Sequence, residues 1–181
     1  LGISKRTIYT VFESKEEVLK SCVTSFRDRR DQSILEINKH AENVIIECMQ
    51  IIDYYRGIQI PNSIFWDDLR KYYPNIHQQI HDGEDNYKTY IKQLLVKGIK
   101  DGYFREDLNT DDAIQLLDFN CFIKVGGIYS EAIPHSHVNP IFMITINLVR
   151  GISTLKGIEA IDQYMAQAHL YHSITRALSA S

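Results

Sequence analysis

Apolar residues recur at spacings of three and four along most of the chain, and no alternating apolar and polar segment persists. This spacing is typical of amphipathic helices and not of strands. Only four prolines and nine glycines interrupt the pattern in 181 residues. The sequence therefore predicts an all-α protein whose helices pack against each other.

Capping signals divide the pattern into separate helices. Ser4, Ser14 and Thr110 are suited to N-cap positions, and Ser14 with Glu17 has the spacing of a capping box. Pro74 is suited to the first turn of a helix. The predicted helices span residues of about 4–12, 15–38, 41–55, 63–73, 74–102, 111–131, 141–156 and 158–178.

The predicted 15–38 helix has the character of a connector. It is expected to bury one side, formed by Val18, Leu19, Cys22, Val23 and Phe26. At 1.5 Å per residue it would be roughly 36 Å long, which is enough to join two domains. We therefore predict two domains, one over residues 1–38 and one over residues 39–181.

Charge is distributed unevenly along the chain. Residues 1–30 contain seven Lys and Arg residues against four Asp and Glu residues, a local net charge of +3, whereas the whole chain carries −3. This asymmetry suits a DNA-facing start joined to a neutral or acidic body. The three cysteines are far apart and lie in apolar stretches, so we expect buried thiols and a reducing cytoplasm. No apolar run approaches the roughly 20 residues of a membrane span.

The first predicted helix combines a polar face with a small apolar face. Its exposed positions carry side chains that are donors, acceptors or cations, namely Ser4, Lys5, Arg6, Thr7, Tyr9 and Thr10. Ile8 and Phe12, four residues apart, face inward. Such polar side chains can reach phosphates and base edges in a DNA groove. Lys15 lies in the first turn of the next helix, where a cation is disfavoured unless a phosphate docks there.

The string from Gly2 to Leu19 resembles the helix-turn-helix of the tetracycline-repressor (TetR) family. The resemblance comprises a Gly-aliphatic-Ser turn, a Tyr-x-x-Phe helix and a Ser-Lys-Glu-Glu cap. Weaker resemblance returns at 102–107 and 150–157. The resemblance over Gly2 to Leu19 implies that the first helix is the recognition helix and that Tyr9 and Lys15 contact phosphates. It also implies that Arg6, Thr7 and Thr10 read bases. The pattern departs from the family at Val11, where an aromatic residue or His is common. Two helices that precede this turn in the family are missing, so we expect further residues upstream of Leu1.

The resemblance also implies a ligand-responsive regulator, a repressor that a small molecule releases from operator DNA. We expect the ligand between the helices of about 41–55, 65–73, 74–102 and 111–131, where aromatic side chains favour an apolar or aromatic effector. The expected lining residues are Cys48, Tyr55, Phe65, Trp66, Tyr90, Leu94, Phe119 and Phe122. For each of them a place in the plain core is the competing interpretation. Tyr54, Tyr55, Tyr72 and Tyr73 supply hydroxyls that could orient a polar group.

A homodimer is expected through the helices of about 111–131 and 141–156, which carry more apolar surface than a monomer's exterior usually does. We expect no cofactor, no resident metal and no enzymatic activity. Two alternatives stay open. One is a small all-α metal-dependent enzyme that uses Asp67, Asp68, His77 or His81, of which the two histidines have ligand spacing. The other is a helical protein-interaction module.

Overall fold

The computed structural model describes residues 4–58, 63–125 and 140–179, and within these ranges every regular element is a helix. The fold class predicted from the apolar spacing is therefore confirmed. The helices are α1 (Lys5–Ile8), α2 (Lys15–His40), α3 (Val44–Arg56), α4 (Ser63–Tyr72), α5 (Pro74–Lys100), α6 (Thr110–Val125), α8 (Pro140–Ile152) and α9 (Leu155–Ser179).

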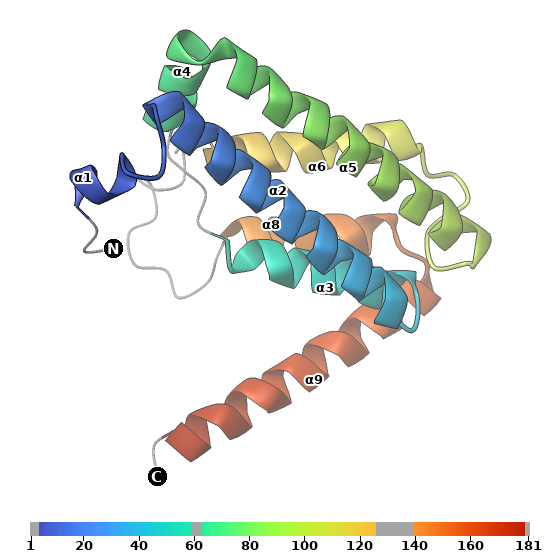
Figure 1. Ribbon diagram of the computed structural model, residues 1–181. Coiled ribbons are helices and arrows are strands. Elements are labelled where there is room, and N and C mark those ends of the chain that lie inside the picture. The colour runs from blue at the N-terminus through green and yellow to red at the C-terminus, as the bar shows by residue number, and fades with distance from the viewer. Residues whose placement is uncertain (1–3, 59–62, 126–139, 180–181) are drawn as a thin grey trace.

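The long helices α2 and α5 lie side by side and run in the same direction (Figure 1). Helix α3 packs against both of them, and α4 packs on α5 close to the start of α2. Helices α6 and α8 pack on each other, and α6 also packs on α5. Helix α9 packs on α3, and its C-terminal end projects away from the other helices, while α1 lies beside the start of α2 (Figure 1).

The core gathers apolar side chains from several helices around α3. Its buried members are Val44, Ile45, Met49, Ile51, Leu94, Leu95, Phe104, Ala113, Ile146, Val149 and Ile161. Phe104 belongs to the loop after α5 and is fully buried. Burying these aliphatic and aromatic side chains is the main favourable contribution to folding.

The loop after α5 is tied to the corner between α8 and α9. Phe104 and Ser153 form an antiparallel bridge, and the backbone N–H of Thr154 donates to the Tyr103 carbonyl at 3.0 Å. A Cβ at Gly157 would lie 2.3 Å from the same carbonyl oxygen, so only glycine allows this close approach. The predicted 141–156 helix is therefore wrong at its end. It stops at Ile152 because this corner turns there, and the next helix begins at Leu155 instead of Ile158.

Two other helix starts differ from the prediction because an asparagine provides the cap. Asn43 Oδ1 accepts from the backbone N–H groups of Ile45 and Ile46, so α3 begins at Val44 and not at Ala41. Asn109 Oδ1 accepts in the same way from the N–H groups at the start of α6, and it replaces Thr110 as the cap. Both follow the general preference for a short polar side chain that reaches the first free N–H groups.

The expected buried side of the connector helix is only partly formed. Cys22 is exposed and Phe26 is 40% exposed, whereas Val18, Leu19 and Val23 are half-buried. The prediction that the cysteine thiols are buried is therefore wrong for Cys22. The last part of the predicted 111–131 helix lies outside the described residues.

Candidate nucleic-acid interface and ligand-binding region

Helix α1 is capped and seated as its sequence predicts. Ser4 Oγ accepts from the backbone N–H of Thr7 at 3.1 Å, the interaction expected of an N-cap serine. Ile8 and Phe12 are half-buried, and Arg6, Thr7 and Thr10 are exposed. The polar side chains of Arg6, Thr7 and Thr10 therefore face solvent, while Ile8 and Phe12 are partly removed from it.

The regular part of α1 is shorter than predicted. The helix ends at Ile8, and Tyr9 to Val11 form a turn that is closed by N–H donation from Val11 and Phe12 to the Ile8 carbonyl. The Thr10 hydroxyl donates to the Thr7 carbonyl at 2.7 Å. A side chain therefore provides a hydrogen bond to a backbone carbonyl in the last turn of α1. The prediction of a helix through Phe12 is therefore wrong. Tyr9 and Val11 lie on the turn with 45% and 72% exposure.

Helix α2 begins with a modified capping box. The Glu17 N–H donates to Ser14 Oγ at 3.1 Å, and the Glu17 carboxylate accepts from the N–H of Glu13 at 2.6 Å. In the standard motif the carboxylate would reach the N–H of Ser14 itself. Lys15 is exposed at this helix start, and its ammonium lies 5.6 Å from the centroid of the Tyr73 ring. The side chain of Lys5, which with Arg6 and Lys15 makes up the expected cations of this surface, lies outside the described part.

Not all cations of the first 30 residues are available to a nucleic acid. Arg30 is buried, and its guanidinium donates to the Gly83 carbonyl of α5 at 3.2 Å and lies 5.6 Å from the Tyr87 ring centroid. Arg27 lies against Gly83 as well. These two arginines join α2 to α5. From the charge pattern, Arg27 and Arg30 were counted with the positively charged, DNA-facing surface. The pattern does not show which side of a helix packs against another helix.

The expected ligand-lining residues of α3 and α5 meet in the structure. Cys48, Tyr55 and Tyr90 are half-buried against the core, and Leu94 is a buried member of it. Burial raises the pKa of the Cys48 thiol to about 12, so this cysteine is a neutral side chain at pH 7. The Tyr55 ring packs edge-on against Tyr87 at 5.7 Å.

A buried carboxylate lies in the middle of this group. Glu47 is 1% exposed, and its carboxylate accepts from the hydroxyl of Tyr90 and from the Asn38 amide, the latter at 2.6 Å. The cluster therefore links α2, α3 and α5. Burial and the hydrogen bond to Glu47 raise the pKa of Tyr90, so its hydroxyl keeps its proton at neutral pH.

The remaining expected lining residues lie on α4 and α6. Phe65 and Trp66 are half-buried and pack edge to face, with ring centroids 5.6 Å apart. Phe119 and Phe122 belong to α6, and their side chains lie outside the described part. The described lining residues thus come from α3, α4 and α5.

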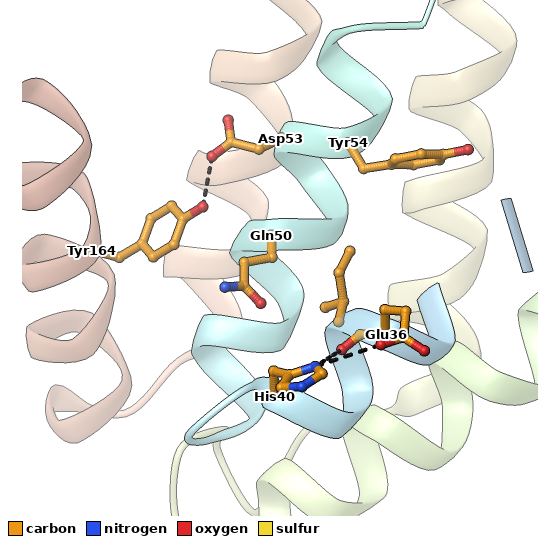
Figure 2. Close-up of a pocket in the computed structure, with 7 residues that line it drawn as sticks. Glu36, His40, Gln50, Asp53, Tyr54 and Tyr164 are labelled. Carbon is orange, nitrogen blue, oxygen red and sulfur yellow. Dashed lines mark hydrogen bonds and ion pairs between the residues drawn. The ribbon is translucent and has the colours of Figure 1, made fainter. Parts of the chain in front are cut away.

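A hollow of about 410 Å³ opens at a different place, between α2, α3 and α9 (Figure 2). Its lining residues are Glu36, Ile37, His40, Gln50, Asp53, Tyr54 and Tyr164. The Tyr164 hydroxyl donates to Asp53 at 2.7 Å across the hollow (Figure 2). Of these residues, the sequence prediction named only Tyr54. The polar spacing of Gln50, Asp53 and Tyr54 marks one face of α3, but no sequence signal pairs that face with Tyr164.

The residues of the alternative metal site do not converge. The His77 and His81 rings lie 4.5 Å apart on α5, and burial and the neighbouring His81 lower the pKa of His77. Asp67 forms an exposed ion pair with Arg70 at 2.9 Å. Among the described residues, no group of three or more His, Cys, Asp and Glu side chains is placed to hold a metal ion. No helix in the described ranges has the length and apolar character needed to cross a membrane.

Two solved structures share this architecture. The ketosteroid transcriptional regulator KstR2 of Mycobacterium tuberculosis aligns with a TM-score of 0.62 and 18% identity, over 84% of this chain and 80% of KstR2. The fatty acid degradation regulator FadR from Bacillus halodurans aligns with a TM-score of 0.54 and 17% identity, over 82% of this chain and 77% of FadR. Both are TetR-family regulators, so the predicted resemblance to that family is confirmed at the level of the fold.

Sequence comparison gives a consistent result over a shorter range. The uncharacterized HTH-type transcriptional regulator YhgD of Bacillus subtilis (strain 168) is 26% identical over 105 residues, which are 56% of this chain. The aligned part spans about half of YhgD, 55% of its length. No family model matches the chain.

Proposed function

We propose that this chain belongs to a ligand-responsive, DNA-binding transcriptional regulator, a repressor that a small molecule releases from operator DNA. The observation that carries the proposal is the surface at α1. A capped helical turn and the turn that follows it present Arg6, Thr7 and Thr10 to solvent, while Ile8 and Phe12 are half-buried. Exposed cationic and hydroxyl side chains on one small helical segment are what reading of the major groove requires.

The start of α2 adds a contact for the DNA backbone. The exposed Lys15 side chain lies at the same end of the helix as the first N–H groups, of which that of Glu17 donates to Ser14 Oγ. The lysine and the N–H groups before Glu17 can therefore meet one phosphate. Ser4, Lys5 and Tyr9 complete the proposed DNA-binding set together with Arg6, Thr7, Thr10 and Lys15. Residues 1–38 then form the DNA-binding part, and residues 39–181 form the part for ligand binding and dimerisation.

The proposed ligand site lies among α3, α4, α5 and α6. The half-buried aromatic side chains of Tyr55, Phe65, Trp66 and Tyr90 support an apolar or aromatic effector. KstR2 is described as a ketosteroid regulator and FadR as a fatty acid degradation regulator, and both descriptions concern largely apolar compounds. Cys48 and Leu94, with Phe119 and Phe122, complete the proposed lining.

The proposed mechanism is mechanical. A ligand that wedges these helices apart tilts α2, because α2 is joined to α5 by Arg30 and to α3 by Asn38. The tilt carries α1 with it, and the recognition helices of a dimer lose their match to the two half-sites. The ligand needs only a higher affinity for the tilted state to shift the population toward it.

Operator binding by the full-length protein, including any residues before Leu1, tests the proposal. A random DNA library and the region upstream of its own gene provide the probes. Lys15→Ala should weaken binding to every sequence and lower the slope of log K against log salt by about 0.9 for each phosphate that the protein no longer neutralises. Lys20→Ala is the matched control, since Lys20 is an exposed cation of the same helix that pairs with Glu16 at 3.4 Å.

Two outcomes of this experiment have different meanings. If Lys15→Ala and Lys20→Ala both leave the salt slope unchanged, the phosphate role of Lys15 is wrong. If the unmodified protein prefers no DNA sequence over competitor DNA, the proposed function itself is wrong.

A further inference from the structure

The junction of α4 and α5 lies against the start of α2. The Lys15 ammonium lies 5.6 Å from the centroid of the Tyr73 ring, within the range of a cation–π interaction. Tyr73 is half-buried, whereas Lys15 is exposed. Among the ion pairs of the described residues none includes Lys15, so the ring is the contact that the structure gives to this ammonium.

Tyr73 stands at a helix N-cap, but its side chain does not cap the helix. It is the N-cap residue of α5, a place that favours Ser, Thr, Asp or Asn, and its side chain makes no capping hydrogen bond. Its backbone nevertheless fixes it firmly. The Tyr73 N–H donates to the Leu69 carbonyl of α4 at 2.9 Å, and its carbonyl accepts from His77 of α5 at 3.0 Å.

Lys15 lies in the first turn of α2 and Tyr73 is the N-cap of α5, and these two helices are joined elsewhere. Arg30 of α2 donates to the Gly83 carbonyl of α5, which fixes how α2 lies along α5 (Figure 1). The packing of α2 on α5 therefore sets where the backbones of Lys15 and Tyr73 lie, and the lysine side chain then reaches the ring. A cation on the face of a ring still has N–H groups that point away from the ring and can donate to another acceptor.

We propose that Tyr73 is a positioning residue for DNA binding, whose ring holds the Lys15 ammonium ready for a DNA phosphate. The inference rests on the proposed function, because it assumes the phosphate role of Lys15. A lysine that is free in solution loses side-chain freedom when it binds a phosphate, and a lysine already held by a ring loses less. Since Tyr73 joins α4 to α5, a displacement of α4 carries the ring away from Lys15.

Operator affinity of the full-length protein tests the inference through a double-mutant cycle. Tyr73→Leu should weaken binding about two- to fivefold per protomer, the amount expected for an exposed cation–π contact. In the Lys15→Ala background the same substitution should change affinity by less than about twofold. Tyr73→Phe keeps the ring and should bind like the unmodified protein.

Tyr72→Leu is the matched control. Tyr72 is the neighbouring residue, is 60% exposed, and carries the Lys71 ammonium 5.0 Å from its ring centroid. Its substitution removes a contact of the same kind and should leave operator affinity within about twofold. In the unmodified protein the ε-methylene protons of Lys15 should also show an upfield ring-current shift in NMR spectra, a readout that needs no substitution.

The outcomes separate the inference from the proposed function. Equal losses for Tyr73→Leu in both backgrounds, an unchanged or increased affinity, or the absence of the ring-current shift would each overturn the positioning role. In all three cases sequence-specific binding by the unmodified protein would leave the proposed function intact. Absence of any preferred DNA sequence would instead overturn the proposed function.

Discussion

Glu47 illustrates how a carboxylate is accommodated inside a helical core. It is 1% exposed, yet the hydroxyl of Tyr90 and the amide of Asn38 both donate to it. A buried polar group is tolerated when it has hydrogen-bond partners and is costly without them. The cluster therefore places a few oriented polar groups in the otherwise apolar region proposed for the ligand, an arrangement common in small-molecule sites.

Trp66 is the only tryptophan of the chain, so its fluorescence reports on α4 alone. Titration with an apolar probe, a steroid ketone or a long-chain acyl compound, should change this fluorescence with saturation. Tyr90→Phe should weaken the response about two- to tenfold, because it removes one oriented hydroxyl from the proposed site. The measurement is a fluorescence titration at fixed protein concentration.

Tyr164→Phe is the matched variant for the hollow of Figure 2, since Tyr164 also donates its hydroxyl to a carboxylate, that of Asp53. It should leave the response unchanged. Loss of response in Tyr164→Phe with none in Tyr90→Phe would move the ligand site to the hollow. Probes that never perturb Trp66 would contradict the proposed location.

At the scale of elements, the joint between α2 and α5 determines how the DNA-facing end sits on the rest of the chain. Two side chains of α2 meet α5 at Gly83, where the absence of a Cβ allows close packing: a Cβ there would lie 3.3 Å from Arg27 Cδ. Arg30 then donates to the Gly83 carbonyl and stacks near Tyr87. A planar guanidinium suits such a place because it hydrogen-bonds at its edge and packs on a ring with its face.

Arg30→Gln should lower the free energy of unfolding by about 1–3 kcal/mol, because it removes a buried hydrogen bond and the ring contact together. Arg29→Gln is the control, since Arg29 is exposed and the same charge is removed from the same helix. That substitution should change stability by less than about 0.5 kcal/mol. Guanidinium chloride titrations at one protein concentration compare the two, and equal losses would contradict the assigned role of Arg30.

A second joint explains two short segments that resemble the TetR family in sequence. Residues 102–107 and 150–157 are far apart in the chain, but they contact each other through the Phe104–Ser153 bridge and the hydrogen bond from Thr154 to Tyr103. Arg105 adds a backbone hydrogen bond to the Ile152 carbonyl at 3.0 Å. Each segment therefore supplies hydrogen-bond partners to the other.

At the scale of the whole molecule, α6 and α8 pack on each other and leave apolar side chains exposed. Leu116 of α6 is 51% exposed and Met143 of α8 is 40% exposed. Solvent-exposed apolar side chains on adjacent helices support a two-fold dimer through this pair, the arrangement that two DNA half-sites require.

If the proposed dimer forms through α6 and α8, the double variant Leu116→Glu with Met143→Glu should be monomeric, because burying two carboxylates in an apolar interface is costly. Sedimentation equilibrium measures the outcome. Leu35→Glu is the control, since Leu35 is 52% exposed on α2 and lies outside the pair. An unchanged mass for the double variant, or a monomeric unmodified protein, would contradict the proposed dimer helices.

Local interactions made several features predictable from the sequence alone. The apolar spacing specified an all-α chain, and the Ser4 and Ser14 caps formed as predicted because each cap involves residues within four positions of each other. The partial burial of Ile8 and Phe12 was predictable from their spacing of four residues, although the regular helix ends at Ile8. The starts of α3 and α6 were misplaced because a neighbouring asparagine provides the cap, and the start of α9 was misplaced because the chain turns at the Phe104–Ser153 bridge.

Tertiary structure alone decided which partner each buried face meets. Periodicity identifies a face that is removed from water, but it carries no information about the opposite surface. The burial of Arg30 against Gly83, the placement of Glu47 between Asn38 and Tyr90, and the end of α8 at the Phe104 bridge all join residues that are distant in sequence. Fewer cations of the first 30 residues are exposed than the charge count suggests, because two of the arginines lie against another helix.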